Sequence, residues 1–193
     1  MKNALLLSLL CLPGVALGQT QRTTAQAFGV SVTTSSINQQ TPAAVAPADG
    51  MAQNESSDIT MGSMVTAQNA YAVASGSSDR LLENAVGNAS LGTVVILDGL
   101  ITATGVVAIA TSTPDGDNFD GSSVSNLVVN GVAMSAPAPN TRVDLPDVGY
   151  VILNEQISTR SGITVNMIHV VLDQNGRYGA GEIIVGSASS NVK

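Results

Sequence analysis

Apolar and polar residues alternate along much of this chain, and the alternation predicts β-strands rather than helices. The pattern is strongest in the last third, residues 125–186, which is rich in β-branched residues and is broken at intervals by turn residues. We expect strands at residues 27–33, 59–65, 69–75, 93–97, 100–111, 126–129, 132–134, 142–145, 149–157, 162–172 and 182–185.

Short turn motifs separate these segments and indicate antiparallel hairpins. Asn130-Gly131 is typical of a type I′ turn, which needs positive φ at both central positions. Asp98-Gly99 divides the most apolar part of the chain, residues 91–111, into two strands. These turns predict strands that are neighbours in the sequence and also in space.

The remaining segments complete the predicted organisation. Pro146 and Gly149 indicate a further hairpin turn, and Gly186 is expected to end the last strand. Residues 34–58, rich in Pro, Ala, Gln and Asn, predict a long loop, and residues 80–89 are the only candidate helix. The whole pattern predicts one all-β domain, an antiparallel β-sandwich-like fold with a loose N-terminal region.

The first 18 residues have the organisation of a secretory signal peptide. Lys2 precedes an apolar run, a Pro-Gly breaker follows, and small residues lead to a cleavage site before Gln19. Leu9 and Leu10 before Cys11 are poor matches to a lipid-attachment site. We therefore expect residues 19–193 to be a secreted domain, extracellular or periplasmic.

Composition then restricts the possible functions. Cleavage removes Lys2 and Cys11, which leaves six of the seven basic residues against all 14 acidic ones and no cysteine. An acidic chain repels phosphate backbones, so nucleic acid is excluded as an expected partner. No segment after Gln19 reaches the length of a membrane-spanning helix. Few aromatic residues remain, so Val, Ile, Leu and Ala must fill the core.

An ordered series of short motifs resembles the choice-of-anchor P family of bacterial secreted proteins. The motifs that carry the resemblance are Pro139-Asn140-Thr141, Asp144-Leu145-Pro146, Leu153-Asn154-Glu155-Gln156, Ile163-Thr164-Val165-Asn166 with His169-Val170, and Gly181 to Ala188. The resemblance implies export and display at the cell surface, and it implies no particular activity. No sorting motif or hydrophobic tail follows the last predicted strand, so covalent surface attachment is not expected.

Asp115, Asp117 and Asp120, with Asn118 among them, form the densest acidic cluster. Oxygen ligands at alternate loop positions suit calcium, and no other cofactor is predicted. Phe119 occupies a position where a further ligand would be useful. Two interpretations stay open, a weak calcium loop or solvated turn residues.

Two further residues invite a chemical interpretation. His169 is the only histidine, and period-two alternation places it on one strand face with Val165 and Met167, as a hydrogen-bonded structural residue. Glu155 has two alternative interpretations. In the first it is solvated or pairs with Arg142 or Arg160, and in the second it forms a glycosidase-like dyad with another carboxylate. The acidic residues considered as its partner in a dyad are Asp144, Asp173 and Glu182.

These observations favour a secreted non-catalytic structural or interaction module of the bacterial cell exterior. One histidine and no cysteine leave little for nucleophile–base pairs. Its expected partner is an envelope or extracellular component, or a second copy through self-association. The alternative is a polysaccharide-binding or polysaccharide-cleaving domain that uses Glu155 and a second carboxylate.

Overall fold

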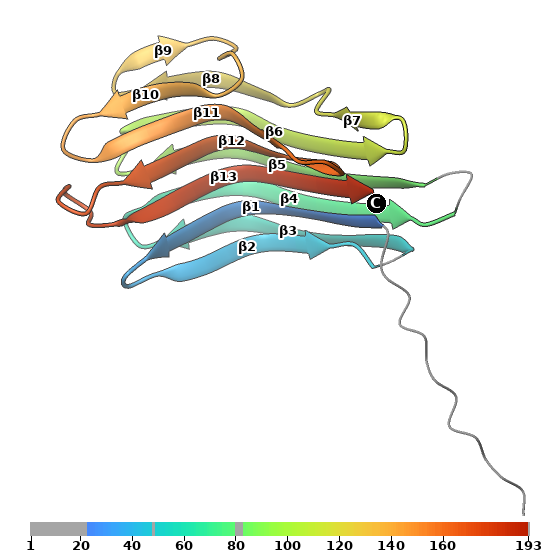
Figure 1. The fold of residues 1–193 in the computed structure, drawn as a ribbon. Coiled ribbons are helices and arrows are strands. Elements are labelled where there is room, and N and C mark those ends of the chain that lie inside the picture. Colours follow the sequence, from blue (N-terminus) through green and yellow to red (C-terminus); the bar gives the residue numbers. More distant parts are fainter. Residues whose placement is uncertain (1–22, 48, 80–82, 193) are drawn as a thin grey trace, which may run out of the picture.

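The computed structural model describes residues 23–47, 49–79 and 83–192, and it contains two antiparallel β-sheets packed as a sandwich (Figure 1). This part of the chain has 13 strands and no helix, so the predicted all-β sandwich is confirmed. None of the described residues forms a helix that could cross a membrane. The predicted signal peptide lies outside the described residues.

Sheet A contains six strands in the order β10-β11-β12-β13-β1-β2. Their bounds are Thr23–Thr34 for β1, Asn38–Val45 for β2, Thr141–Leu145 for β10, Gly149–Ser158 for β11, Gly162–Leu172 for β12 and Gly181–Val192 for β13. Sheet B contains seven, in the order β3-β4-β5-β6-β8-β9, with β7 paired to β6. Their bounds are Gly50–Met61 for β3, Val65–Ser77 for β4, Asn84–Ile96 for β5, Ile101–Thr113 for β6, Gly116–Asn118 for β7, Ser123–Val129 for β8 and Val132–Met134 for β9.

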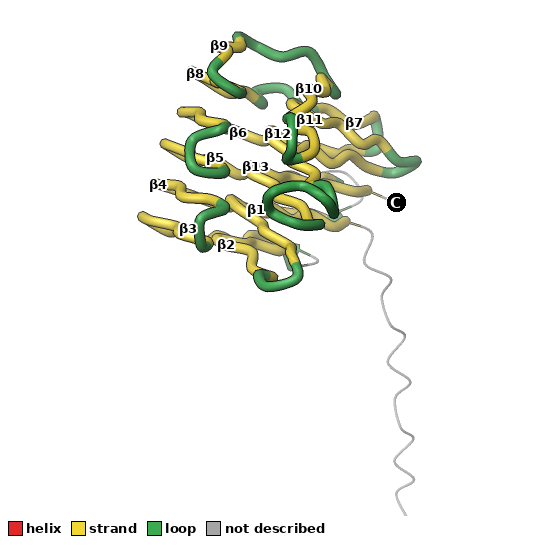
Figure 2. The backbone as a smooth tube through the Cα atoms, turned by 90° about the vertical axis from the view of Figure 1, so that its left-hand side faces the viewer, coloured by secondary structure: helices red, strands yellow, loops and turns green. Residues whose placement is uncertain are grey.

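The chain follows a simple path through the two layers, which Figure 2 shows side by side. It forms β1 and β2 in sheet A, crosses to build all of sheet B, and returns at β10. The last strand, β13, then pairs with β1 from Thr23↔Val192 to Thr34↔Gly181. The first and last strands of the described chain therefore pair with each other inside sheet A, whose edges are β10 and β2.

The predicted turns are confirmed by their backbone angles. Asn130 and Gly131 have φ values of 49° and 77° between β8 and β9, as a type I′ turn requires. Asp98 and Gly99 have φ values of 56° and 91° between β5 and β6. The hairpin after Pro146 joins β10 to β11.

Several predicted boundaries are wrong, mainly in polar or small-residue segments. The predicted loop at residues 34–58 contains β2 and most of β3, which are edge strands with many exposed polar side chains and so lack an apolar alternation. The expected strand at residues 59–65 is split by a turn after Met61. The short strand β7 lies at Gly116–Asn118, where no strand was expected, and β1 already begins at Thr23 in the region expected to be loose.

The candidate helix at residues 80–89 is also wrong where the structure describes it. Residues 80–82 lie outside the described residues, and β5 begins at Asn84. The inward-facing residues at the start of β5 are Ala85, Gly87 and Ala89, and all three are buried. Such small side chains give little hydrophobic signal, which explains why the alternation was missed.

A row of residues across the middle of each sheet interrupts the two-residue alternation. We call these residues the central row of each sheet. In sheet A the central row contains Gly29, Asn154, Met167 and Gly186, which the regular pairing of neighbouring strands skips. In sheet A the ladder between β11 and β12 passes from Leu153↔Ile168 to Glu155↔Asn166 on either side of it. In sheet B the row contains Asn69, Gly92, Gly105 and Asn126. Five members have left-handed backbones, with φ between 49° and 66°: Asn69, Gly105, Asn126, Asn154 and Gly186.

The central row moves the inward-facing positions by one residue on each strand that it crosses. In β1 the buried residues are Ala25 and Ala27 before the row but Val30 and Val32 after it, so Phe28 points outward although Val30 points inward. Gly186 was predicted to end the last strand, and this is wrong, because β13 continues to Val192. The phase changes without ending the hydrogen-bonded ladder, at a left-handed residue such as Gly186 in β13 and without one at Gly29 in β1.

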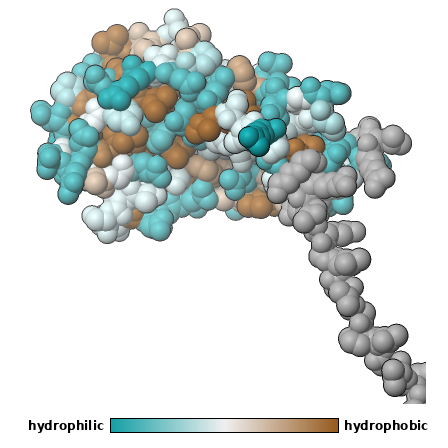
Figure 3. Space-filling model, viewed as in Figure 1, coloured by the Kyte–Doolittle hydropathy of each residue, from teal (hydrophilic) through white to brown (hydrophobic). Residues whose placement is uncertain are grey.

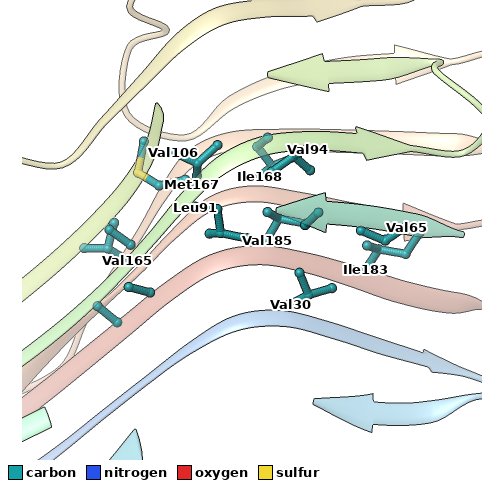
Figure 4. Close-up of a cluster of buried hydrophobic side chains, with 14 of the residues drawn as sticks. Val30, Val65, Leu91, Val94, Val106, Val165, Met167, Ile168, Ile183 and Val185 are labelled. Carbon is teal, nitrogen blue, oxygen red and sulfur yellow. The ribbon is translucent and has the colours of Figure 1, made fainter. Parts of the chain in front are cut away.

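The core between the sheets has two halves of different composition on either side of the central row. One half is filled by branched residues, and Figure 4 shows Val30, Ile183 and Val185 of sheet A facing Val65 and Val94 of sheet B. The other half is rich in alanine, namely Ala25, Ala27, Ala70, Ala72, Ala74, Ala85, Ala89, Ala108, Ala110 and Ala188. The predicted aliphatic core is therefore confirmed.

Gly87 marks a close approach of the two sheets in the alanine-rich half. A Cβ atom there would lie 2.5 Å from the carbonyl oxygen of Gln26 and 2.8 Å from that of Ser189, both in sheet A. Nearby, the hydroxyls of Ser112 and Ser190 are 2.8 Å apart and join the two sheets. Small side chains here let the two backbones approach, so the alanine content is a packing requirement.

Candidate functional site

The outer face of sheet A carries a connected group of polar side chains from three adjacent strands. Glu155 of β11, Asn166 of β12 and Ser187 of β13 lie side by side, because the register pairs Glu155↔Asn166 and Asn166↔Ser187. Asn166 donates from Nδ2 to Oε2 of Glu155 at 2.7 Å, and Ser187 donates to Oδ1 of Asn166 at 2.7 Å. Both hydrogen-bonding ends of the Asn166 amide are thus occupied, which fixes its orientation.

His169 joins this group from across the central row. Its Nδ1 atom lies 2.9 Å from Oε2 of Glu155, although the residue directly opposite His169 on β11 is Ile152. The side chains of His169 and Glu155 are only 16% and 12% exposed, so water screens their contact little. We call Glu155, Asn166, His169 and Ser187 the polar network.

A second carboxylate lies on the far side of the imidazole. Oε2 of Glu182 is 3.5 Å from Nε2 of His169, and the Glu182 side chain is 48% exposed. Within the described chain Nε2 is buried and has no hydrogen-bond partner. The distance is within ion-pair range but too long for a strong hydrogen bond, so Glu182 acts mainly through its charge.

The two glutamates determine the charge state of the site. The hydrogen bond that His169 donates to Glu155 raises the pKa of His169 above its ordinary value, and the Glu182 charge adds to the effect. The hydrogen bonds from His169 and Asn166 lower the pKa of Glu155, against the opposing effect of burial. The arrangement therefore favours an imidazolium held between carboxylates.

Apolar side chains surround the polar network. Ile152 and Ile184 lie directly on either side of His169 in the ladder, and Tyr150, Val171 and Phe28 are half-buried on the same face. Figure 3 shows this side of the molecule, where hydrophobic patches lie between hydrophilic residues. The polar network therefore has apolar neighbours on most sides, and Glu182 is the charged side chain that borders it.

Arg142 and Tyr150 form a second fixed feature at the edge of this face. The guanidinium carbon of Arg142 lies 3.8 Å from the centre of the Tyr150 ring, and Arg142 also pairs with Asp144 at 3.1 Å. Arg142 and Asp144 are both exposed, so their ion pair adds little stability. The stacked Arg–Tyr pair instead presents a flat, partly apolar group to solvent.

The sequence identified two members of this site but placed them incorrectly. His169 was expected on the face of Val165 and Met167, yet those residues point inward and His169 points outward because the central row lies between them. Glu155 was expected in solvent, beside an arginine, or in a carboxylate dyad, and it pairs with His169 instead. Asn166 and Ser187 were missed, since their proximity depends on the pairing of β12 with β13.

The geometry gives no support to the carboxylate dyad. Of the three acidic residues considered as partners of Glu155, Glu182 lies nearest to the network, and the His169 ring separates the two carboxylates. Glycoside hydrolysis needs one carboxyl group that stays protonated, which requires a raised pKa. The pKa of Glu155 is lowered, so Glu155 does not suit the acid role, and the ionised role would need a second carboxylate facing it without the intervening ring.

The three acidic residues of the predicted calcium loop, Asp115, Asp117 and Asp120, are all exposed. Asp115 and Asp117 line a surface hollow that also includes Arg160, whose positive charge opposes cation binding. In the described ranges no three His, Cys, Asp or Glu side chains form a metal-ligand group. Calcium binding stays a prediction of the sequence.

Comparisons of this chain with models of protein families, with curated proteins and with solved structures find no match. The resemblance to the choice-of-anchor P family therefore stays an expectation based on the motifs.

Proposed function

We propose that this chain is a secreted, non-catalytic structural or interaction module of the bacterial cell exterior, and that the outer face of sheet A is its recognition surface. The polar network, held in one orientation within an apolar frame, is the observation that carries this proposal. Hydrogen bonds hold the side chains of the polar network in place. These side chains do not contribute to the core, because the core lies on the opposite face of the sheet.

The composition of this face suits protein or polymer recognition. Binding surfaces are enriched in aromatic residues and arginine, and their centres are mostly uncharged. Here Tyr150 and Arg142 are stacked, and Ile152 and Ile184 flank the network. A fixed charged group between apolar neighbours gives orientation to a partner that the apolar surface alone would bind without selectivity.

Binding to fractionated bacterial envelope tests the proposal. The exported protein is immobilised, captured components are identified by mass spectrometry, and each one is purified and titrated against the protein. We expect Ile184→Lys to weaken binding at least tenfold, because it places a long charged side chain beside His169. Gln26→Lys, an exposed change on the same sheet beyond the central row, should leave binding unchanged.

The non-catalytic part of the proposal has its own test. A screen of glycans, peptides and esters with the exported protein should give no turnover above that of the heat-denatured sample. Turnover that disappears in Glu155→Gln would contradict the proposal and favour the polysaccharide-cleaving alternative. Binding that is equal in Ile184→Lys and in the unmodified protein would remove sheet A as the recognition surface.

A further inference from the structure

The outer face of sheet B contains three adjacent long strands without a charged residue. In sheet A the strands β1 and β2 also lack charge, but they are followed in the sheet by β13, which carries Glu182. The strands β4, β5 and β6 each have 13 residues, and none of these residues is Asp, Glu, Lys or Arg. About half of these residues face the core, and the outward ones are likewise uncharged. Sheet A has Arg142, Asp144, Glu155 and Glu182 on its outer face.

Apolar residues lie at the middle of this charge-free face, which we define as the outward side chains of β4, β5 and β6. Asn88 of β5 lies between Val73 and Ile109 in the ladder, and the row beside it is Tyr71↔Ser90↔Val107. The six side chains of these two rows are all half-buried. An apolar centre, a hydroxyl- and amide-bearing surround and a lack of charge are the features of a protein interface core.

We propose that the charge-free face binds the same face of a second copy of this chain, forming a face-to-face dimer. The excess of acidic over basic residues makes copies repel one another, and that repulsion is weakest where neither surface carries charge. This inference goes beyond the proposed function and uses the opposite face. It leaves both sheet A surfaces pointing outward, so one dimer would present two recognition surfaces.

The size of the face agrees with a stable homodimer. With strands about 4.8 Å apart and a rise of about 3.4 Å per residue, β4, β5 and β6 cover about 600 Å². The flanking strands β3 and β8 extend this area to about 1,000 Å². A standard interface buries about 800 Å² on each partner, which lies between these values.

The charges at the border of the face select one arrangement of the two copies. Glu55 and Asp58 of β3 lie opposite Tyr71 and Gln68 of β4, so this border is acidic. On the other border β8 has no charged residue, and Asp117 of β7 pairs with Ser112, which is buried on the core side of the sheet. A two-fold axis running along β5 places β3 of one copy over β8 of the other and keeps the acidic borders apart. It also places Asn88 close to its own counterpart.

Sedimentation velocity of the exported protein tests the dimer over a range of concentrations. We expect reversible dimerisation that Asn88→Asp weakens at least tenfold, because it brings two negative charges together with almost no change in volume. Gln40→Glu, which adds the same charge on the exposed outer face of sheet A, is the matched control and should dimerise normally. Far-ultraviolet circular dichroism verifies that both variants are folded.

A mixture of variants makes the test specific to this interface. Asn88→Lys alone should also be monomeric, and mixing it with Asn88→Asp should restore dimers, since opposite charges then meet across the axis. A protein that is monomeric up to about 1 mM, or a dimer unaffected by either change, overturns the inference. A monomer that sediments with cellulose in an Asn88-dependent manner would overturn it in favour of a neutral polymer. None of these results depends on the sheet A partner.

Discussion

Nδ1 of His169 lies 2.9 Å from Oε2 of Glu155, although the two residues are three positions apart in the ladder. Asn166, which lies directly opposite Glu155, and His169 share the outer face of β12. In a regular strand, residues three positions apart point to opposite faces. The phase change at Met167 in the central row therefore creates the polar network.

Glu155→Gln should destabilise the fold by about 1–2 kcal/mol, because hydrogen bonds to a charged, partly buried group are stronger than neutral ones. Glutamine keeps the size and can still accept a hydrogen bond, so the loss reports mainly on the charge. Chemical denaturation measures the change. Glu182→Gln is the control and should cost less than about 1 kcal/mol, since that side chain is half-exposed and more distant. Equal effects of the two changes would contradict the geometry.

The contribution of the pair to stability should depend on pH. The folded pKa of His169 is raised, so its contribution is complete below its ordinary value of 6.5 and is lost as the pH rises through the folded pKa. The folded pKa of Glu155 is lowered, so its contribution is present above 4.5 and is lost as the pH falls through the folded pKa.

The contribution of the His169–Glu155 pair to stability should therefore be largest between pH 4.5 and pH 6.5. Urea denaturation of the protein and of His169→Gln at about pH 5.5 and about pH 8.5 measures it, because the difference between the two proteins removes the effect of all other groups. We expect the advantage of the histidine to be larger at the lower pH. An advantage that grows toward pH 8.5 would mean that His169 is held in its neutral form.

Gly87→Ala should destabilise the protein by about 1–3 kcal/mol through overpacking, because the new methyl group would press on two backbone carbonyls that cannot move independently of sheet A. Thermal unfolding by calorimetry measures the effect. Gly76→Ala is a matched control in the adjacent strand, where the nearest atom is a side-chain hydroxyl at 3.3 Å. A Gly87→Ala protein as stable as this control would indicate wider sheet separation.

Gly131→Val should cost about 1–3 kcal/mol, the range for a β-branched residue forced into a left-handed backbone. Space does not limit this position, because a Cβ atom there would have no described atom within 4 Å. Gly131→Asn, which tolerates positive φ, should be much less costly. An unchanged melting temperature for the valine variant would contradict the type I′ turn.

The sequence alone determined the fold class and several hairpins, because turns such as Asn130-Gly131 and Asp98-Gly99 act through local backbone preferences. It also identified Glu155 and His169 as residues of interest. It did not reveal the edge strands β2 and β3, whose polar side chains are exposed, or the start of β5, whose inward residues are alanine and glycine.

Only the tertiary structure decided which residues face each other. The central row changes the phase of the strands, and a single left-handed residue such as Asn154 or Gly186 leaves no clear trace in the hydrophobic pattern. Its effect becomes visible only when neighbouring strands are aligned, because the register carries the phase change from strand to strand. Local sequence preferences therefore fix the turns, while the polar network, the alanine-rich half of the core and the charge-free face depend on long-range pairing.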